Sequence, residues 1–125
     1  KAVQIAVSAW TAEALKATMP ASVFSRSTEC HNQDKVSMGT IAARDCMRIL
    51  ELTEQVAAAL LLSVCQGVEI RQREGSITDA NLTASMKSMK QEVFEHFEFL
   101  EEDRPLDKTL KQFVSLIQQQ NWELY

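Results

Sequence analysis

The sequence is poor in glycine, and its cysteines show no pairing pattern. Three glycines in 125 residues cannot supply a glycine-rich phosphate loop. Cys30, Cys46 and Cys65 are odd in number and lack the C-x-x-C spacing, which argues against a disulfide framework or a zinc site. Free cysteines are typical of a reducing compartment, so we expect a cytoplasmic protein.

Basic charge and long apolar runs are also lacking. The 13 Lys and Arg residues are scattered, and 17 Asp and Glu residues outnumber them to give a net charge of -4. A nucleic-acid interface needs clustered basic residues, so no nucleic-acid partner is expected. No uninterrupted run reaches the roughly 20 apolar residues that cross a bilayer, and no basic and apolar leader is visible. We therefore expect neither a membrane partner nor secretion.

Common catalytic templates are missing too. His31 and His96 are the only histidines, and two histidines without further ligands at suitable spacing do not make a metal site. Cys30 and His31 are adjacent, so their side chains point apart, beyond the hydrogen-bond reach that a thiolate–imidazole pair requires. The residues alone therefore show no complete active site and predict no metal.

Helical periodicity, in contrast, runs through most of the chain. Apolar residues recur at three- and four-residue steps, and no strand alternation or internal repeat occurs. We predict an all-α fold of one domain at most, with a loop at residues 20–34 and helices at residues 1–19, 35–72, 80–100 and 106–120. Because the helical pattern is under way at the first residues and Lys1 replaces Met, we expect part of a longer chain.

The second predicted helix is too long and too apolar for this chain alone. It would be roughly 55 Å long, with Asp34 or Ser37 as its cap. Residues 55–68 carry no charge on any face, and a helix that is apolar all round must be surrounded by other helices or by lipid. Fourteen residues are too few to span lipid, so other helices are expected. We expect those helices from missing chain or other subunits, and we expect Leu61→Asp to block assembly.

A dense polar cluster precedes this helix. It contains Glu29, His31, Asn32, Gln33 and Asp34 within six positions. Such side chains are costly to hold beside an apolar core unless they are paired. Two interpretations remain open on residue type: a site that meets a polar ligand, or a solvated loop that ends in a helix cap.

Several short segments form a recognisable series. They are residues 20–23 (Pro-Ala-Ser-Val), 29–34 (Glu-Cys-His-Asn-Gln-Asp), 36–39 (Val-Ser-Met-Gly), 42–44 (Ala-Ala-Arg) and 66–71 (Gln-Gly-Val-Glu-Ile-Arg). Residues 104–106 (Arg-Pro-Leu) and 122–125 (Trp-Glu-Leu-Tyr) extend it to the end of the sequence. This series resembles the aromatic amino-acid ammonia-lyase and 2,3-aminomutase family. The block at 31–39 is the most specific part.

The resemblance implies that this chain is the C-terminal helical part of a longer enzyme. It also implies that the enzyme has a fumarase/aspartase-like, histidine ammonia-lyase-like fold. It implies a homotetramer built around helices shared between subunits.

The family uses an electrophilic 4-methylidene-imidazole-5-one (MIO) group, formed from an Ala-Ser-Gly tripeptide, and a mobile-loop tyrosine as base. This sequence contains no such tripeptide, and its only tyrosine is Tyr125. An arginine that binds the substrate carboxylate also lies upstream in the family. The isolated chain is therefore expected to be inactive.

The resemblance assigns roles to three residues. Glu29 matches an acidic catalytic residue near the substrate amino group, and Asn32 and Gln33 match residues that line the substrate pocket. Histidine-specific members carry glutamate at the position of Gln33, so a neutral amide favours phenylalanine or tyrosine as substrate. Lys35 departs from the His that many histidine lyases have after Asp.

The sequence leaves three functions open. The first is elimination of ammonia from an aromatic L-amino acid to give a trans-arylacrylate. The second is a 2,3-aminomutase that returns the ammonia to give a β-amino acid. The third is a non-catalytic helical interaction module, for which the missing catalytic parts would be no obstacle.

Overall fold

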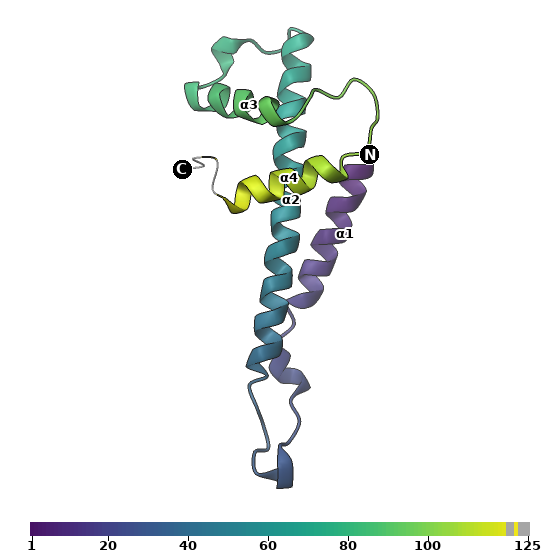
Figure 1. The fold of residues 1–125 in the computed structure, drawn as a ribbon, viewed down its shortest axis with the longest axis vertical. Helices are drawn as coiled ribbons and strands as arrows, with labels where there is room; N and C mark the ends of the chain where they lie inside the picture. The colour runs from purple at the N-terminus through teal and green to yellow at the C-terminus, as the bar shows by residue number, and fades with distance from the viewer. Residues whose placement is uncertain (120–121, 123–125) are drawn as a thin grey trace. The chain divides into compact units, whose positions relative to one another are not determined.

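The computed structural model describes residues 1–119 and 122, and this part of the chain contains helices and loops but no strand (Figure 1). The α-helices are α1 (Ala2–Ala17), α2 (Gly39–Arg73), α3 (Ala84–His96) and α4 (Asp107–Gln118). Three 3-10 turns join them: η1 (Ala21–Phe24), η2 (Glu29–His31) and η3 (Asp79–Asn81). The predicted all-α fold is confirmed. The predicted C-terminal segment, except Trp122, lies outside the described residues.

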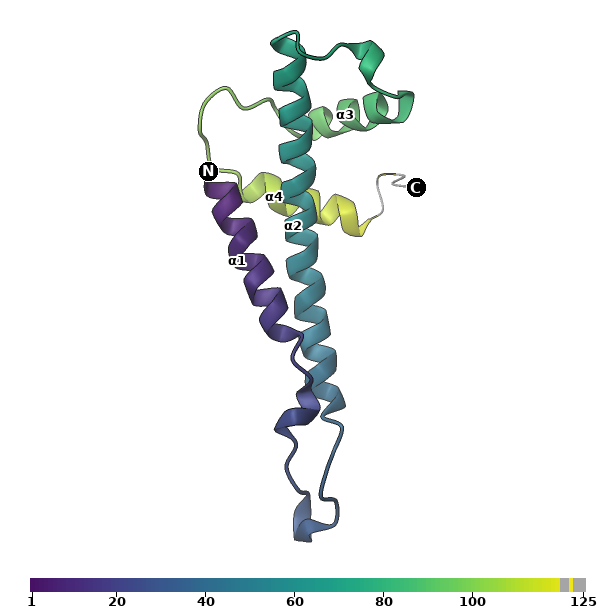
Figure 2. The same cartoon turned by 180° about the vertical axis from the view of Figure 1, so that it is seen from behind.

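The chain forms two compact units, Lys1–Val56 and Ala57–Tyr125, and α2 contributes to both. In the first unit, α1 and the beginning of α2 run side by side in opposite directions (Figure 1 and Figure 2). The Arg48 guanidinium donates to Glu13 at 2.8 Å and lowers the pKa of that carboxyl. Both side chains are about half exposed, so this ion pair adds little stability. Burial of Leu52, which is fully enclosed, contributes more.

The second unit has its own apolar core. Aromatic side chains dominate it, because each buries a large area. Phe113 of α4 is fully buried and stacks on Trp122 with ring centroids 5.5 Å apart. The core cluster consists of Ala58, Leu62, Cys65, Val93, Phe97, Phe113 and Trp122. Burial raises the pKa of the Cys65 thiol, whereas Cys30 and Cys46 of the first unit are exposed.

Two predicted helix ends in the first unit were wrong. The first helix stops at Ala17 rather than 19, because both the N–H and the hydroxyl of Thr18 turn back to the Leu15 carbonyl. The second begins at Gly39 rather than 35. Met38 has a left-handed backbone (φ 57°), and its carbonyl accepts the N–H groups of Ile41 and Ala42. Met38 thus takes the cap position that was predicted for Asp34 or Ser37.

The predicted helix at 80–100 is shorter at both ends. Residues 79–81 form η3, and α3 starts after Thr83, whose hydroxyl accepts the Met86 N–H at 3.3 Å. The chain then leaves the helix at His96 and becomes extended at Phe97. The last helix, predicted at 106–120, covers Asp107–Gln118, and residue 120 lies outside the described residues.

Gln66 explains why the chain after α3 is extended. Its amide group donates to the Leu100 carbonyl at 3.0 Å and accepts the Leu100 N–H at 3.1 Å. In a helix, the Leu100 N–H and carbonyl would form hydrogen bonds with other backbone groups of that helix. Because they bind Gln66 instead, this segment is extended and held on α2. Gln66 is the first residue of the 66–71 segment, which therefore has a structural role here.

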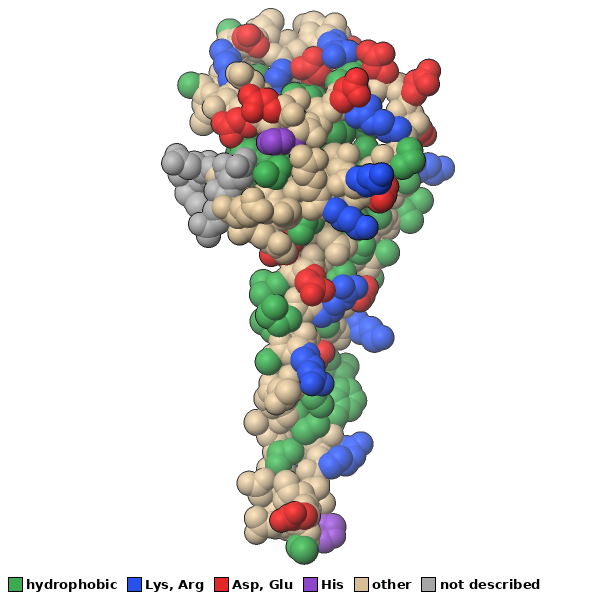
Figure 3. All heavy atoms as spheres, in the orientation of Figure 1, with side chains coloured by type: hydrophobic (Ala, Val, Ile, Leu, Met, Phe, Trp, Pro, Cys, Tyr) green, Lys and Arg blue, Asp and Glu red, His purple; other side chains and the backbone are tan. Residues whose placement is uncertain are grey.

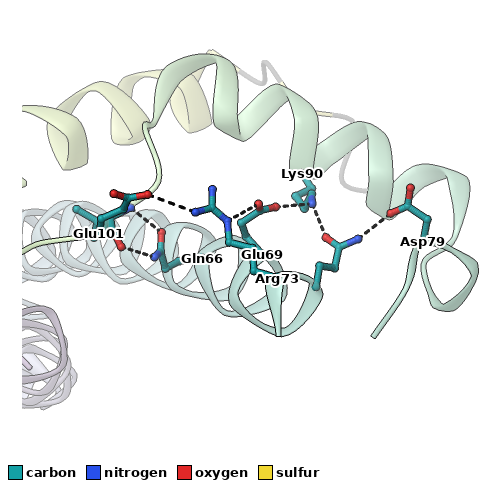
Figure 4. A network of polar contacts seen from close by, with 8 residues as sticks. Gln66, Glu69, Arg73, Asp79, Lys90 and Glu101 are labelled. Carbon is teal, nitrogen blue, oxygen red and sulfur yellow. Dashed lines mark hydrogen bonds and ion pairs between the residues drawn. The ribbon is translucent and has the colours of Figure 1, made fainter. Parts of the chain in front are cut away.

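Charged residues extend this contact along α2 (Figure 4). Glu69 binds Lys90 of α3 at 2.8 Å and Arg73 at 2.9 Å, and Arg73 reaches Glu101 at 3.5 Å. Lys90 also donates to Gln72. The Lys90 ammonium and then the Arg73 guanidinium lower the pKa of Glu69. The network fixes α3 and the following segment on α2.

We expect Gln66→Leu to destabilise the second unit. Both Leu100 backbone groups would lose their partner, and each lost hydrogen bond costs about 0.5–1.5 kcal/mol, with more for groups that stay buried. Thermal denaturation should show a melting temperature several degrees lower. Gln91→Leu, the same change at an exposed position of α3, serves as the control. Equal melting temperatures for the two variants would contradict this role of Gln66.

The charge-free run at 55–68 is enclosed on one side only. Ala58, Leu62 and Cys65 lie in the core of the second unit, whereas Leu60 is 61% exposed and Val64 52%. The described residues thus leave an apolar face of α2 exposed at Leu60 and Val64. The prediction that partner helices come from elsewhere remains a prediction. Leu61 packs against the chain's own core, so Leu61→Asp would also damage the fold and Leu60 is the better probe.

The first unit also has uncovered apolar side chains. Figure 3 shows hydrophobic side chains among charged groups on the visible face of this part of the chain. They belong to α1, η1, the residues between these two elements and the first part of α2: Ile5, Leu15, Met19, Val23, Phe24, Ile41, Met47 and Leu50. Apolar surface of this extent is typical of a polypeptide that packs against further protein.

By length and composition alone, α2 also qualifies as a membrane-spanning helix, and 28% of its most apolar stretch is buried within the chain. The stretch qualifies on its average hydropathy despite scattered polar residues, although it contains no uninterrupted apolar run of spanning length. Core helices of soluble proteins have the same property. Gln66 and Glu69 of α2 bind Leu100 and Lys90, as expected of a helix that packs against protein.

Candidate active-site loop

The candidate site is the loop that joins α1 to α2, and it projects beyond the first turn of α2 within the first unit (Figure 1). Its two arms are joined near the base, where the Ser25 hydroxyl accepts the Val36 N–H at 2.8 Å. Arg26 donates to the Phe24 and Ser25 carbonyls at 3.0 and 2.9 Å, which orders the first arm. The loop is therefore held by its own hydrogen bonds.

The tip of the loop is a tight turn at residues 28–33. Thr28 and Gln33 face each other across it: the Thr28 N–H donates to the Gln33 carbonyl at 3.1 Å. The Gln33 N–H returns a hydrogen bond to the Thr28 hydroxyl at 3.0 Å. Inside the turn, the N–H groups of His31 and Asn32 donate to the carbonyls of Thr28 and Glu29.

Two adjacent residues in the tip have an unusual backbone. Cys30 and His31 adopt left-handed conformations, with φ of 49° and 56°. Such a conformation costs about 1–3 kcal/mol for each residue other than glycine and persists only when its surroundings impose it. Strained residues of this kind cluster at functional sites, so the backbone of this turn is consistent with a functional role.

The structure brings the three predicted site residues onto one turn. Glu29 opens η2, and Asn32 and Gln33 follow it directly; all three side chains are exposed. An exposed carboxylate beside two amides can share a proton with an amine and donate or accept hydrogen bonds. These side chains are therefore free to face a ligand or another part of a larger protein.

The remaining polar residues of the cluster do not form a second site. The ring of His31 shares a hydrogen bond with the Ser27 hydroxyl, with Nδ1 and Oγ 3.0 Å apart. Asp34 is exposed and precedes the first residue of α2 by several positions. Within residues 1–119 and 122, no group of three His, Cys, Asp or Glu side chains is placed to hold a metal.

Sequence reasoning overlooked Ser27 and Thr28, whose hydroxyls organise the tip. The available signal was two hydroxyl residues directly before a polar cluster, since Ser and Thr commonly bind nearby backbone groups and form turns.

Comparison with known proteins now places the loop in a family. The family described as aromatic amino acid lyase matches residues 1–93, which include α1, the whole loop, α2 and most of α3. The chain belongs to the aromatic amino acid lyase family. This confirms the resemblance that the loop residues indicated.

Individual relatives agree with this assignment. A tyrosine ammonia-lyase from Cereibacter sphaeroides is 38% identical over 94% of this chain and 22% of its own length. A histidine ammonia-lyase from Desulfotalea psychrophila is 31% identical over 92% of this chain and 21% of its own length. A histidine ammonia-lyase from Homo sapiens is 52% identical over 40% of this chain and 8% of its own length. The chain thus spans about a fifth of the length of the relatives that it matches almost from end to end.

Proposed function

We propose that this chain is the C-terminal helical part of an enzyme that eliminates ammonia from phenylalanine or tyrosine to give a trans-arylacrylate. The observation that carries the proposal is the similarity to a tyrosine ammonia-lyase over 118 of the 125 residues, which must include the loop. We further propose that the enzyme is a cytoplasmic homotetramer. The exposed apolar face of α2 at Leu60 and Val64 supports this assembly.

The MIO group would come from elsewhere in the polypeptide. The 125 residues contain no Ala-Ser-Gly tripeptide, and their only tyrosine is Tyr125, so this chain supplies neither the electrophile nor a loop tyrosine. When present, the MIO group supplies an electrophile for the elimination. The chain's own contribution is the turn at residues 28–33, which offers side chains to the substrate end of the site. The proposal requires no metal.

Glu29 has the chemistry to handle a proton at the substrate amine. A carboxylate within hydrogen-bond reach of an amino group accepts or returns its proton, which changes how readily ammonia leaves. The turn places Glu29 three residues before Asn32, whose N–H donates to the Glu29 carbonyl at 3.0 Å. We therefore assign Glu29 a catalytic role, and Asn32 a role in orienting the substrate.

Gln33 sets the substrate preference in this proposal. A neutral amide hydrogen-bonds to a polar group without adding charge, whereas a carboxylate at this position would pair with an imidazole. We expect Gln33→Glu to lower kcat/KM for phenylalanine, because a desolvated carboxylate would lie beside a neutral ring, and to raise it for histidine. Steady-state kinetics with both substrates test this. A parallel change for the two substrates would contradict a specificity role.

Product analysis tests the function itself. The full-length enzyme is incubated separately with phenylalanine, tyrosine and histidine, and the products are identified by mass spectrometry. Free ammonia with an arylacrylate from phenylalanine or tyrosine is the expected result. A β-amino acid would establish the aminomutase, and urocanate alone would establish histidine as the substrate. No turnover of any of the three would favour the non-catalytic module.

A further inference from the structure

We infer that Thr28 is a positioning residue: it holds the turn that carries Glu29, Asn32 and Gln33 in the form that meets the substrate. The structural half of this inference stands on the geometry of the loop alone. The catalytic half rests on the proposed function.

All three hydrogen-bonding groups of Thr28 bind within the turn, two of them across it to Gln33. Its N–H donates to the Gln33 carbonyl at 3.1 Å, and its carbonyl accepts the His31 N–H at 3.1 Å. Its hydroxyl accepts the Gln33 N–H at 3.0 Å. Thr28 is partly buried, whereas the residues of the turn after it are exposed. The two ends of the turn are therefore joined through this one residue.

The backbone inside the turn needs such a constraint. Cys30 and His31 are both left-handed, although neither is glycine, so each favours a different backbone region when unrestrained. The hydroxyl bond from Thr28 to Gln33 closes the turn beyond them and opposes that relaxation. The hydrogen bond between Ser27 and the His31 ring adds a second restraint at 3.0 Å.

Relaxation of the turn would separate the candidate site residues. Glu29 precedes the two left-handed residues, and Asn32 and Gln33 follow them. Any change of φ at Cys30 or His31 therefore rotates the carboxylate relative to the two amides. Misplacement of a reacting group by about 1 Å costs on the order of 10²-fold in rate. Thr28 acts on the reaction through these residues without contacting the substrate.

Thr28→Val and Thr28→Ser in the full-length enzyme separate the hydroxyl from the shape of the side chain. Valine keeps the volume and removes the acceptor, whereas serine keeps the acceptor. Thr18→Val is the matched control, since the Thr18 hydroxyl donates to the Leu15 carbonyl at 2.7 Å at the end of α1. The rate of hydrogen–deuterium exchange in peptides covering residues 27–34 measures how stable the turn is. Steady-state kinetics measure the effect on kcat and KM.

We expect Thr28→Val to speed exchange in residues 27–34 about tenfold, the effect of losing one hydrogen bond. We expect its kcat to fall by roughly 10- to 100-fold, with KM and melting temperature nearly unchanged. Thr28→Ser should restore both readouts, and Thr18→Val should alter neither.

Unchanged exchange in Thr28→Val would overturn the positioning role, whatever the enzyme does. Faster exchange with unchanged kcat would overturn the catalytic half and would show that the turn lies away from the substrate. Absence of ammonia-lyase activity in the wild-type enzyme contradicts the proposed function. In that case the exchange rates alone still support or overturn the structural role of Thr28.

Discussion

Glu29→Gln is expected to lower the kcat of the full-length enzyme by roughly 10²- to 10⁴-fold, the usual cost of losing a positioned acid–base group. The amide keeps the shape of the side chain but no longer exchanges a proton with the substrate amine. Because Glu29 is exposed at the loop tip, the fold should survive, and the melting temperature and assembly should stay at wild-type values. Rates with phenylalanine and tyrosine, together with thermal denaturation, test this.

Glu102→Gln provides the matched control, since Glu102 is exposed and lies far along the sequence from the loop. It should leave kcat unchanged. Gln33→Ala should lower turnover less than Glu29→Gln, because it removes an orienting group and not a proton carrier. If Glu29→Gln and Gln33→Ala both keep near wild-type kinetics, the loop is structural and the site assignment is wrong.

Leu60→Asp is expected to prevent assembly while leaving this chain's own core intact. Leu60 is 61% exposed within the chain, so the charge would be solvated in an unassembled subunit. In a shared helical bundle the same charge would be buried without a partner, which costs about 3–5 kcal/mol. Light scattering after size exclusion should show a species smaller than a tetramer. Val64→Asp, one turn along α2, should behave in the same way.

Lys87→Asp on α3 is the control for charge alone, because it replaces one exposed charged residue by another. It should assemble like the wild type. A Leu60→Asp variant that remains tetrameric with unchanged thermal stability would show that this face of α2 is not shared between subunits.

Periodicity predicted the helices because the residues that bury the core also set the helical pattern. Val93 and Phe113 lie in the buried core of the second unit, each within the helix that spacing predicted. Helix ends depended on single contacts that periodicity does not encode. The left-handed backbone of Met38 makes α2 begin later than predicted. The hydrogen bonds between Gln66 and Leu100 keep the segment after α3 out of a helix.

The sequence predicted a candidate site in this loop but not the contacts that shape the loop. Polar residue types, and the resemblance they carry, pointed to Glu29, Asn32 and Gln33 on one short segment. The contacts that shape this segment lie between backbone groups and the Thr28 hydroxyl. Two hydroxyl residues before a polar cluster favour a turn, but residue type does not tell which backbone groups the hydroxyls bind.

In the proposed enzyme, Glu29 of this loop faces the substrate amine. The most direct measurement is a crystal structure of the full-length enzyme with a non-reacting phenylalanine or tyrosine analogue bound. We predict a Glu29 carboxylate oxygen within hydrogen-bond reach of the amino nitrogen, about 2.6–3.2 Å or through one water, with the Gln33 amide near the ring. A bound analogue separated from residues 28–33 by other protein segments would contradict this role of Glu29.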